Sequence, residues 1–128
     1  MAASPVFAVT PRLTSVAVSV ANTNRDGTGT IVSLITGVAA GTRINEISVQ
    51  ATAATAAAGM VRIFLYDGAS YRLWDEVAIP IAAASASVKC VRVATTYNNL
   101  ILPSASWQLF VSTHLADTFT VTAMGADL

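Results

Sequence analysis

The residues of this chain that could do chemistry are few and widely spaced. His114 is the single histidine, so a Ser-His-Asp or Cys-His catalytic arrangement would have to combine it with Asp117 or Cys90. No serine lies in a glycine-flanked turn of the kind that exposes a hydrolase nucleophile. A lone histidine at a strand end is more often structural than catalytic. The sequence therefore predicts no catalytic centre, and a small hydrolase ranks last among the functional classes considered.

The sequence also predicts no metal or cofactor site. One cysteine and one histidine cannot supply the usual four ligands of zinc. The segment 22–26 offers side-chain oxygens for calcium, but Asp26 is its sole acid, so we expect a turn there. Asp75 and Glu76 are consecutive in a predicted strand and face opposite sides, which argues against a paired-carboxylate device.

Cys90 is expected to pack in the core. It lies beside Val88 and Val91, where a free thiol behaves as a small hydrophobic side chain. Lys89 and Arg92 are the nearby cations, and they give only weak support for a reactive thiolate. Because one cysteine cannot form an intrachain disulfide, the fold must depend on packing and hydrogen bonds, as in an intracellular folding environment.

The aromatic residues leave two interpretations open. Alternation along the predicted strand places Trp74 on one face with Arg72 and Glu76, and a large aromatic side chain among charges is typical of an interface. The alternative is a sugar-binding platform on a β-sandwich, although most of the aromatic residues are expected in the core. The candidates for such a platform are Tyr66, Tyr71, Trp74 and Trp107.

The composition indicates a protein that associates with other proteins. Hydrophobic residues make up 54% of the chain and charged residues 11%, against roughly 25% charged in an average soluble domain. Seven basic and seven acidic residues cancel, so no overall field attracts nucleic acid or an anionic membrane. Much of the apolar content is alanine, and weakly charged surfaces tend to associate.

Alternating apolar and polar residues predict about eight short strands. The strongest signal is a hairpin over 60–79, where two alternating runs flank Asp67-Gly68. Ile44 is out of register with Ile47 and Val49, which predicts a β-bulge near Asn45. The alanine-rich segment 51–59 is interpreted as a strand end and loop, with a short helix as the alternative. The remaining strands are expected at 13–20, 30–36, 43–50, 88–94, 107–113 and 118–123.

These elements predict an all-β, single-domain β-sandwich of antiparallel strands, similar to a jelly roll. Residues 13–128 would form the sandwich. Residues 1–12 would form an extended arm, since Pro5 and Pro11 disfavour helix. An extended segment of that length spans up to about 40 Å. Met1 to Phe7 lacks the basic and apolar regions of a secretion signal, so synthesis and folding in the cytoplasm are expected.

Four segments share their pattern with one class of proteins. They are 21–27 (ANTNRDG), 59–68 (GMVRIFLYDG) with the following Arg72-Leu73-Trp74, Ser112-Thr113-His114, and 124–127 (MGAD). Together they resemble small structural proteins encoded in tailed-bacteriophage genomes, and most of all capsid decoration (cement) proteins. These are often β-sandwich or jelly-roll modules that sit as trimers on the outside of the head.

The resemblance implies a virion protein of the outer capsid surface that bridges coat subunits and stabilises the expanded shell. Its partners would be the major capsid protein and its own copies in a homotrimer, with no nucleic acid, membrane or cofactor. The candidate subunit or capsid contacts are Pro5, Phe7, Pro11, Arg12, Arg72, Trp74 and Glu76. The rival is a receptor- or glycan-binding module of a tail fibre or spike, with Trp74, Tyr97, Asn98 and Asn99 as the first residues to test.

Overall fold

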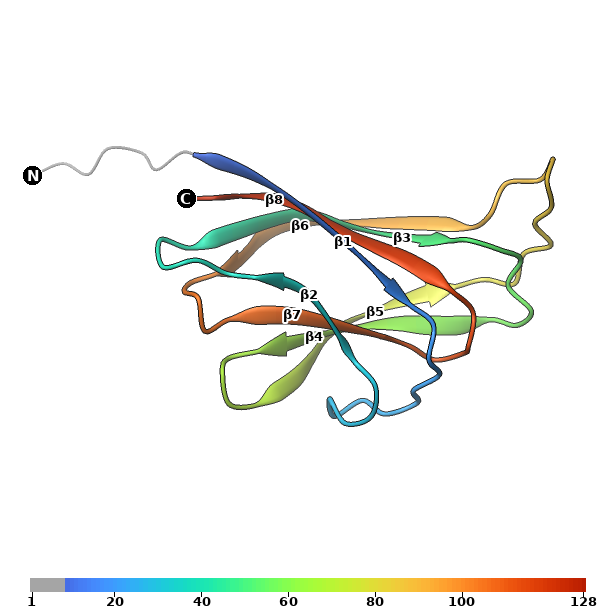
Figure 1. Ribbon diagram of the computed structural model, residues 1–128, viewed down its shortest axis with the longest axis horizontal. Helices are drawn as coiled ribbons and strands as arrows, with labels where there is room; N and C mark the ends of the chain where they lie inside the picture. Colours follow the sequence, from blue (N-terminus) through green and yellow to red (C-terminus); the bar gives the residue numbers. More distant parts are fainter. Residues whose placement is uncertain (1–8) are drawn as a thin grey trace, which may run out of the picture.

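The computed structural model describes residues 9–128, which form two four-stranded antiparallel sheets packed face to face (Figure 1). Sheet A contains, in spatial order, β1 (Thr10–Val18), β8 (Phe119–Asp127), β3 (Thr42–Ala51) and β6 (Arg92–Leu102). Sheet B contains β2 (Val32–Thr36), β7 (Gln108–Thr113), β4 (Gly59–Tyr66) and β5 (Tyr71–Ile79). The predicted all-β sandwich is confirmed. The described residues include no helix that could span a membrane.

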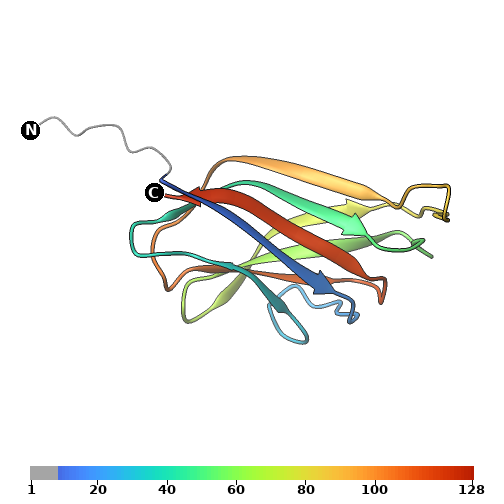
Figure 2. The ribbon, with the colours of Figure 1, turned by 45° about the horizontal axis from the view of Figure 1, so that its top comes forward.

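The order of the strands is that of a jelly roll. The first strand pairs with the last, β2 with β7, β3 with β6, and β4 with β5, all antiparallel. The described chain therefore pairs as one long hairpin that is wrapped on itself, and the wrapping adds the contacts of β3 with β8 and of β4 with β7. Figure 2 shows the resulting two layers, with sheet A above sheet B.

The predicted bulge in the third strand is confirmed. The register of β3 shifts between Ile44 and Glu46 against both of its neighbours. The bulge turns Ile44 and Ile47 to the same side, and both are fully buried. It also presses the backbone onto β8, where a Cβ on Gly125 would lie 1.9 Å from the Arg43 carbonyl oxygen. Only glycine fits at that position without a shift of the backbone.

Several predicted strand boundaries are wrong; the last strand, for example, was predicted to end at Ala123 and continues to Asp127. The first strand begins at Thr10 rather than Leu13, because Pro11 lies in an edge strand, where a missing N–H is tolerated. Residues 10–12 of the predicted arm thus belong to sheet A, and residues 1–8 lie outside the described residues. The strand predicted at 88–94 instead runs over Arg92–Leu102, because Ser85 and Val88 exchange backbone hydrogen bonds in a tight turn.

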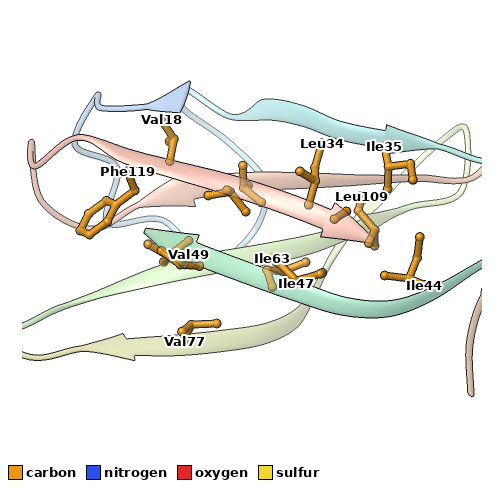
Figure 3. Packing of buried hydrophobic residues seen from close by; sticks show 14 of the residues in the cluster. Val18, Leu34, Ile35, Ile44, Ile47, Val49, Ile63, Val77, Leu109 and Phe119 are labelled. Atoms are coloured by element: carbon orange, nitrogen blue, oxygen red, sulfur yellow. The ribbon is translucent and has the colours of Figure 1, made fainter. Parts of the chain in front are cut away.

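The core lies between the two sheets and is almost entirely aliphatic. Figure 3 shows Ile44, Ile47 and Val49 of β3 facing Ile63 of β4 and Leu109 of β7. The Cys90 side chain packs against this cluster, as predicted.

Candidate functional site

A β-bulge at Trp74 determines which side chains of β5 share a face. Glu76 pairs with Arg62 and Tyr71 pairs with Tyr66, but the register shifts between these two pairs, so Trp74 has no partner in β4. Arg62 and Tyr66 are four residues apart in a strand that pairs regularly with β7. Glu76 and Tyr71 therefore lie on the same face of sheet B, the outer one, although five residues separate them.

The connection between β1 and β2 folds over part of that outer face. Asn22 is buried; its backbone N–H donates to the Thr113 carbonyl and its Nδ2 to the Thr28 carbonyl, at 2.8 and 2.9 Å. Gly27, at a φ of +86°, lies so close to Tyr71 that a Cβ on the glycine would be 2.3 Å from the tyrosine Cβ. The turn predicted for this segment is present, and it lies directly over sheet B.

Arg62 lies at the centre of the buried polar cluster beneath this loop, and only 1% of its surface is exposed. Its Nε donates to Glu76 Oε2 at 3.1 Å and its Nη1 to the Asn22 carbonyl at 3.2 Å. Its Nη2 lies 3.4 Å from His114 Nδ1. Arg25, from the loop, donates from Nε to both oxygens of the same glutamate, at 3.1 Å each. One carboxylate thus serves two guanidinium groups.

An open cavity of about 450 Å³ lies beside this cluster. Two arginines and the histidine form its polar side, and apolar residues from the ends of β4 and β5 form the remainder. The lining residues are Arg25, Ala58, Gly59, Met60, Arg62, Ala78, Ile79, Pro80 and His114. The sequence interpretation missed Arg25 and Arg62. The available signal was Arg62 itself, a cation inside an otherwise apolar strand segment.

The residues considered for catalysis do not come together around His114. Its Nδ1 faces the guanidinium of Arg62, and an arginine cannot accept the imidazole proton as the aspartate of a catalytic triad does. Asp117 and Cys90 do not line the cavity that contains His114. Within residues 9–128, no three side chains of the His, Cys, Asp or Glu types gather as metal ligands.

Three of the predicted contact residues, Arg12, Arg72 and Glu76, form ion pairs within the chain. Arg12 donates to Asp127 Oδ1 at 2.9 Å and to the Thr36 carbonyl at 3.1 Å, which ties β1 to β8 and β2. Arg72 is paired with Asp67 at 3.0 Å. The expectation that Arg72, Trp74 and Glu76 share a face is wrong, because the bulge reverses the alternation along β5.

Among the predicted contact residues in 9–128, Pro11, Arg72 and Trp74 are exposed, and Trp74 is 45% exposed. Pro5 and Phe7 lie outside the described residues. Trp74 lies beside Tyr97 of β6, with ring centroids 6.4 Å apart. The Tyr97 hydroxyl donates to Asp75 Oδ2 at 2.9 Å. Burial of the phenol, together with the hydrogen bond to Asp75 and its negative charge, raises the Tyr97 pKa above its ordinary value.

The outer face of sheet A presents mostly short, uncharged side chains. The strand register places Ser15, Thr122, Ser48 and Ala94 in one row across all four strands. The neighbouring rows are Ala17, Thr120, Gln50 and Arg92 on one side, and Leu13, Met124, Glu46 and Thr96 on the other. The last row, nearest the described start of the chain, is Pro11, Ala126, Arg43 and Ile101. Leu13 is 71% exposed.

Fold and surface together define a jelly-roll module with a weakly charged face on sheet A and an open cavity with a positively charged side on sheet B. No protein-family model matches the sequence, and no curated protein matches it. Among solved structures the chain is similar to one from infectious bursal disease virus, Gx strain, with a TM-score of 0.39 and 12% identity. The match covers 99% of this chain and 36% of that one, so this chain spans about a third of the viral chain's length.

Proposed function

We propose that this chain is a virion structural protein that binds the outside of a phage capsid and stabilises the expanded shell by bridging coat subunits. The observation that carries this proposal is the outer face of sheet A. Its central row, from Ser15 to Ala94, is uncharged and short. Removing such a face from water costs less free energy than removing a charged one. Depletion of charge is also typical of the centre of a protein interface.

Exposed apolar residues near the described start of the chain also favour this face of sheet A as the capsid contact. Val9 and Leu13 are 76% and 71% exposed, and Ile101 is exposed across the sheet from Pro11. In this proposal residues 1–8, which precede Val9 in the sequence, contact a neighbouring coat subunit. Bound copies stabilise the expanded shell by mass action, because they bind that state in preference to the unexpanded one. Copies of the module associate as a homotrimer.

Co-sedimentation with capsids that lack the protein tests this function. Ala94→Arg places a charge at the β6 end of the central row of sheet A, and we expect it to weaken particle binding by about tenfold or more. Ala105→Arg makes the same change at an exposed loop position outside that face, and its binding should equal that of the unmodified protein. Equal binding by both variants would contradict a capsid contact through sheet A.

A second function is favoured by one observation, the exposed Trp74 ring beside Tyr97 and Asp75. An aromatic face next to a carboxylate can stack on a sugar ring and accept hydrogen bonds from its hydroxyls. The module would then belong to a tail fibre or spike. Trp74→Ala should abolish retention on immobilised glycans while Leu73→Ala, at the adjacent exposed position, preserves it. Equal retention of both variants would contradict this alternative.

A further inference from the structure

The cavity on the outer face of sheet B combines positive charge with an apolar wall. We propose that it binds an organic monocarboxylate, with the carboxylate at Arg25 and His114 beside the buried charge of Arg62, and a short apolar chain against Met60, Ala78 and Pro80. The volume of about 450 Å³ lies within the range of roughly 300 to 1,000 Å³ that is usual for small-molecule sites. This site is separate from the proposed capsid contact, which lies on the other sheet.

The charges around the cavity select a single negative charge. Arg25 and Arg62 share the Glu76 carboxylate, so the three side chains together carry one excess positive charge. A monocarboxylate neutralises that excess, whereas a doubly charged phosphate would bring a surplus of negative charge next to Glu76. The planar guanidinium group also matches the two oxygens of a carboxylate.

Donors for the carboxylate are available at the cavity surface. Arg25 uses its Nε for Glu76, and its terminal nitrogens make no hydrogen bond to any residue in 9–128. His114 presents Nδ1 to Arg62; in the neutral tautomer that accepts there, Nε2 carries the proton and is a further donor. Arg62 is fixed by Glu76 and Asn22, so its orientation costs little to establish when a ligand binds.

The apolar wall explains why the ligand is organic rather than a simple ion. Met60 and Ala78 are paired across β4 and β5, and the exposed Pro80 follows the end of β5. Covering these side chains removes apolar surface from water, which adds to binding only when the carboxylate carries a hydrocarbon part. Two sources share this chemistry: a free short-chain acid, and the terminal carboxylate of a polypeptide that ends in an apolar residue.

Titration of the full chain with hexanoate, followed by amide chemical shifts in NMR, tests the site. We expect saturable shifts at Met60, Ile79 and His114, and at least about tenfold weaker binding of hexanamide, which keeps the chain and lacks the charge. A peptide that ends in leucine, compared with its C-terminal amide, distinguishes the two sources. Tighter binding of the peptide acid than of hexanoate indicates a polypeptide ligand, and the reverse indicates a free acid.

Two substitutions test the proposed carboxylate site and leave the buried Arg62 unchanged. Arg25→Gln changes an exposed side chain and should weaken hexanoate by about tenfold. Arg72→Gln, the matched control, removes an arginine that does not line the cavity and should leave hexanoate binding unchanged. Equal affinity for hexanoate and hexanamide, an absence of saturation, or equal effects of the two variants would overturn the proposal.

Discussion

At the scale of single residues, Arg62 connects three parts of the sandwich. Its guanidinium contacts the Glu76 side chain of β5, the Asn22 carbonyl of the loop after β1, and the ring of His114 after β7. A buried ion pair adds little net stability over an apolar pair, but removal of one partner leaves an uncompensated charge. Arg62 therefore specifies how the loop sits on sheet B more than it adds to the free energy of unfolding.

The ion pairs of Glu76 with Arg62 and Arg25 predict that substitutions of Glu76 and of Arg25 change the free energy of unfolding by different amounts. Glu76→Gln leaves Arg62 buried without its carboxylate, and we expect a loss of about 3 kcal/mol in the free energy of unfolding. Arg25→Gln breaks only the exposed pair and should cost less than about 1 kcal/mol. Urea denaturation of both variants measures the difference. An equally small loss of unfolding free energy in both variants would contradict the conclusion that buried Arg62 needs the Glu76 carboxylate.

The turn after β4 predicts a pH dependence at Asp67. Hydrogen bonds from the Ser70 and Ala69 backbone N–H groups, and then from Arg72, lower the Asp67 pKa to about 2. Since the folded pKa lies below the ordinary aspartate value of 3.8, the stabilising contribution is present above pH 3.8. It disappears as the pH falls towards 2. Carboxyl NMR should show this midpoint, and an Asp67 midpoint near 4 would contradict the turn geometry.

At the scale of elements, the bulges of β3 and β5 show what the sequence could and could not predict. The bulge of β3 was predictable, because Ile44 is out of register with Ile47 and Val49 and only an extra residue places all three in the core. The bulge of β5 was not predictable. Tyr71, Leu73 and Asp75 alternate with residues that are also aromatic or charged, so the two faces of this strand look alike in the sequence and neither register is preferred. The site on the outer face of sheet B depends on that second bulge, so its residues could not be grouped from the sequence.

The last strand of sheet A predicts a strong effect for a small substitution. Gly125→Ala places a methyl group against the Arg43 carbonyl, where the Cβ would be 1.9 Å from the oxygen. We expect a loss of at least about 2 kcal/mol in the free energy of unfolding, as for overpacked sites in protein interiors. Gly59→Ala is the control, since its Cβ would lie 3.3 Å from Leu115 Cδ1. Thermal unfolding compares the two, and a similar melting temperature would contradict the close contact at the bulge.

At the scale of the whole molecule, two truncations of different length separate the role of the arm in binding from the role of β1 in stability. Removal of residues 1–8 leaves the Arg12–Asp127 ion pair and the β1–β8 ladder intact, so the melting temperature should not change while particle binding weakens. Removal of residues 1–12 also deletes the ion pair and should lower the melting temperature. Calorimetry and co-sedimentation separate the two effects, and full particle binding without residues 1–8 would exclude the bridging arm.

The two-sheet β-sandwich was predictable, because eight short alternating segments separated by turn residues have few other ways to bury one face each. The strand order and the outer surfaces were not, since they depend on how distant strands pair. Sheet A has an uncharged centre and sheet B a charged cavity, and this asymmetry is the basis for assigning the two faces different partners.

Cryo-electron microscopy of capsids incubated with the full chain tests the proposed function most directly. We expect added density at symmetry-related positions on the outer surface, with sheet A towards the shell and the Arg62 cavity facing away from it. Bare particles at saturating protein, or density in which sheet A faces solvent, would contradict the proposed function.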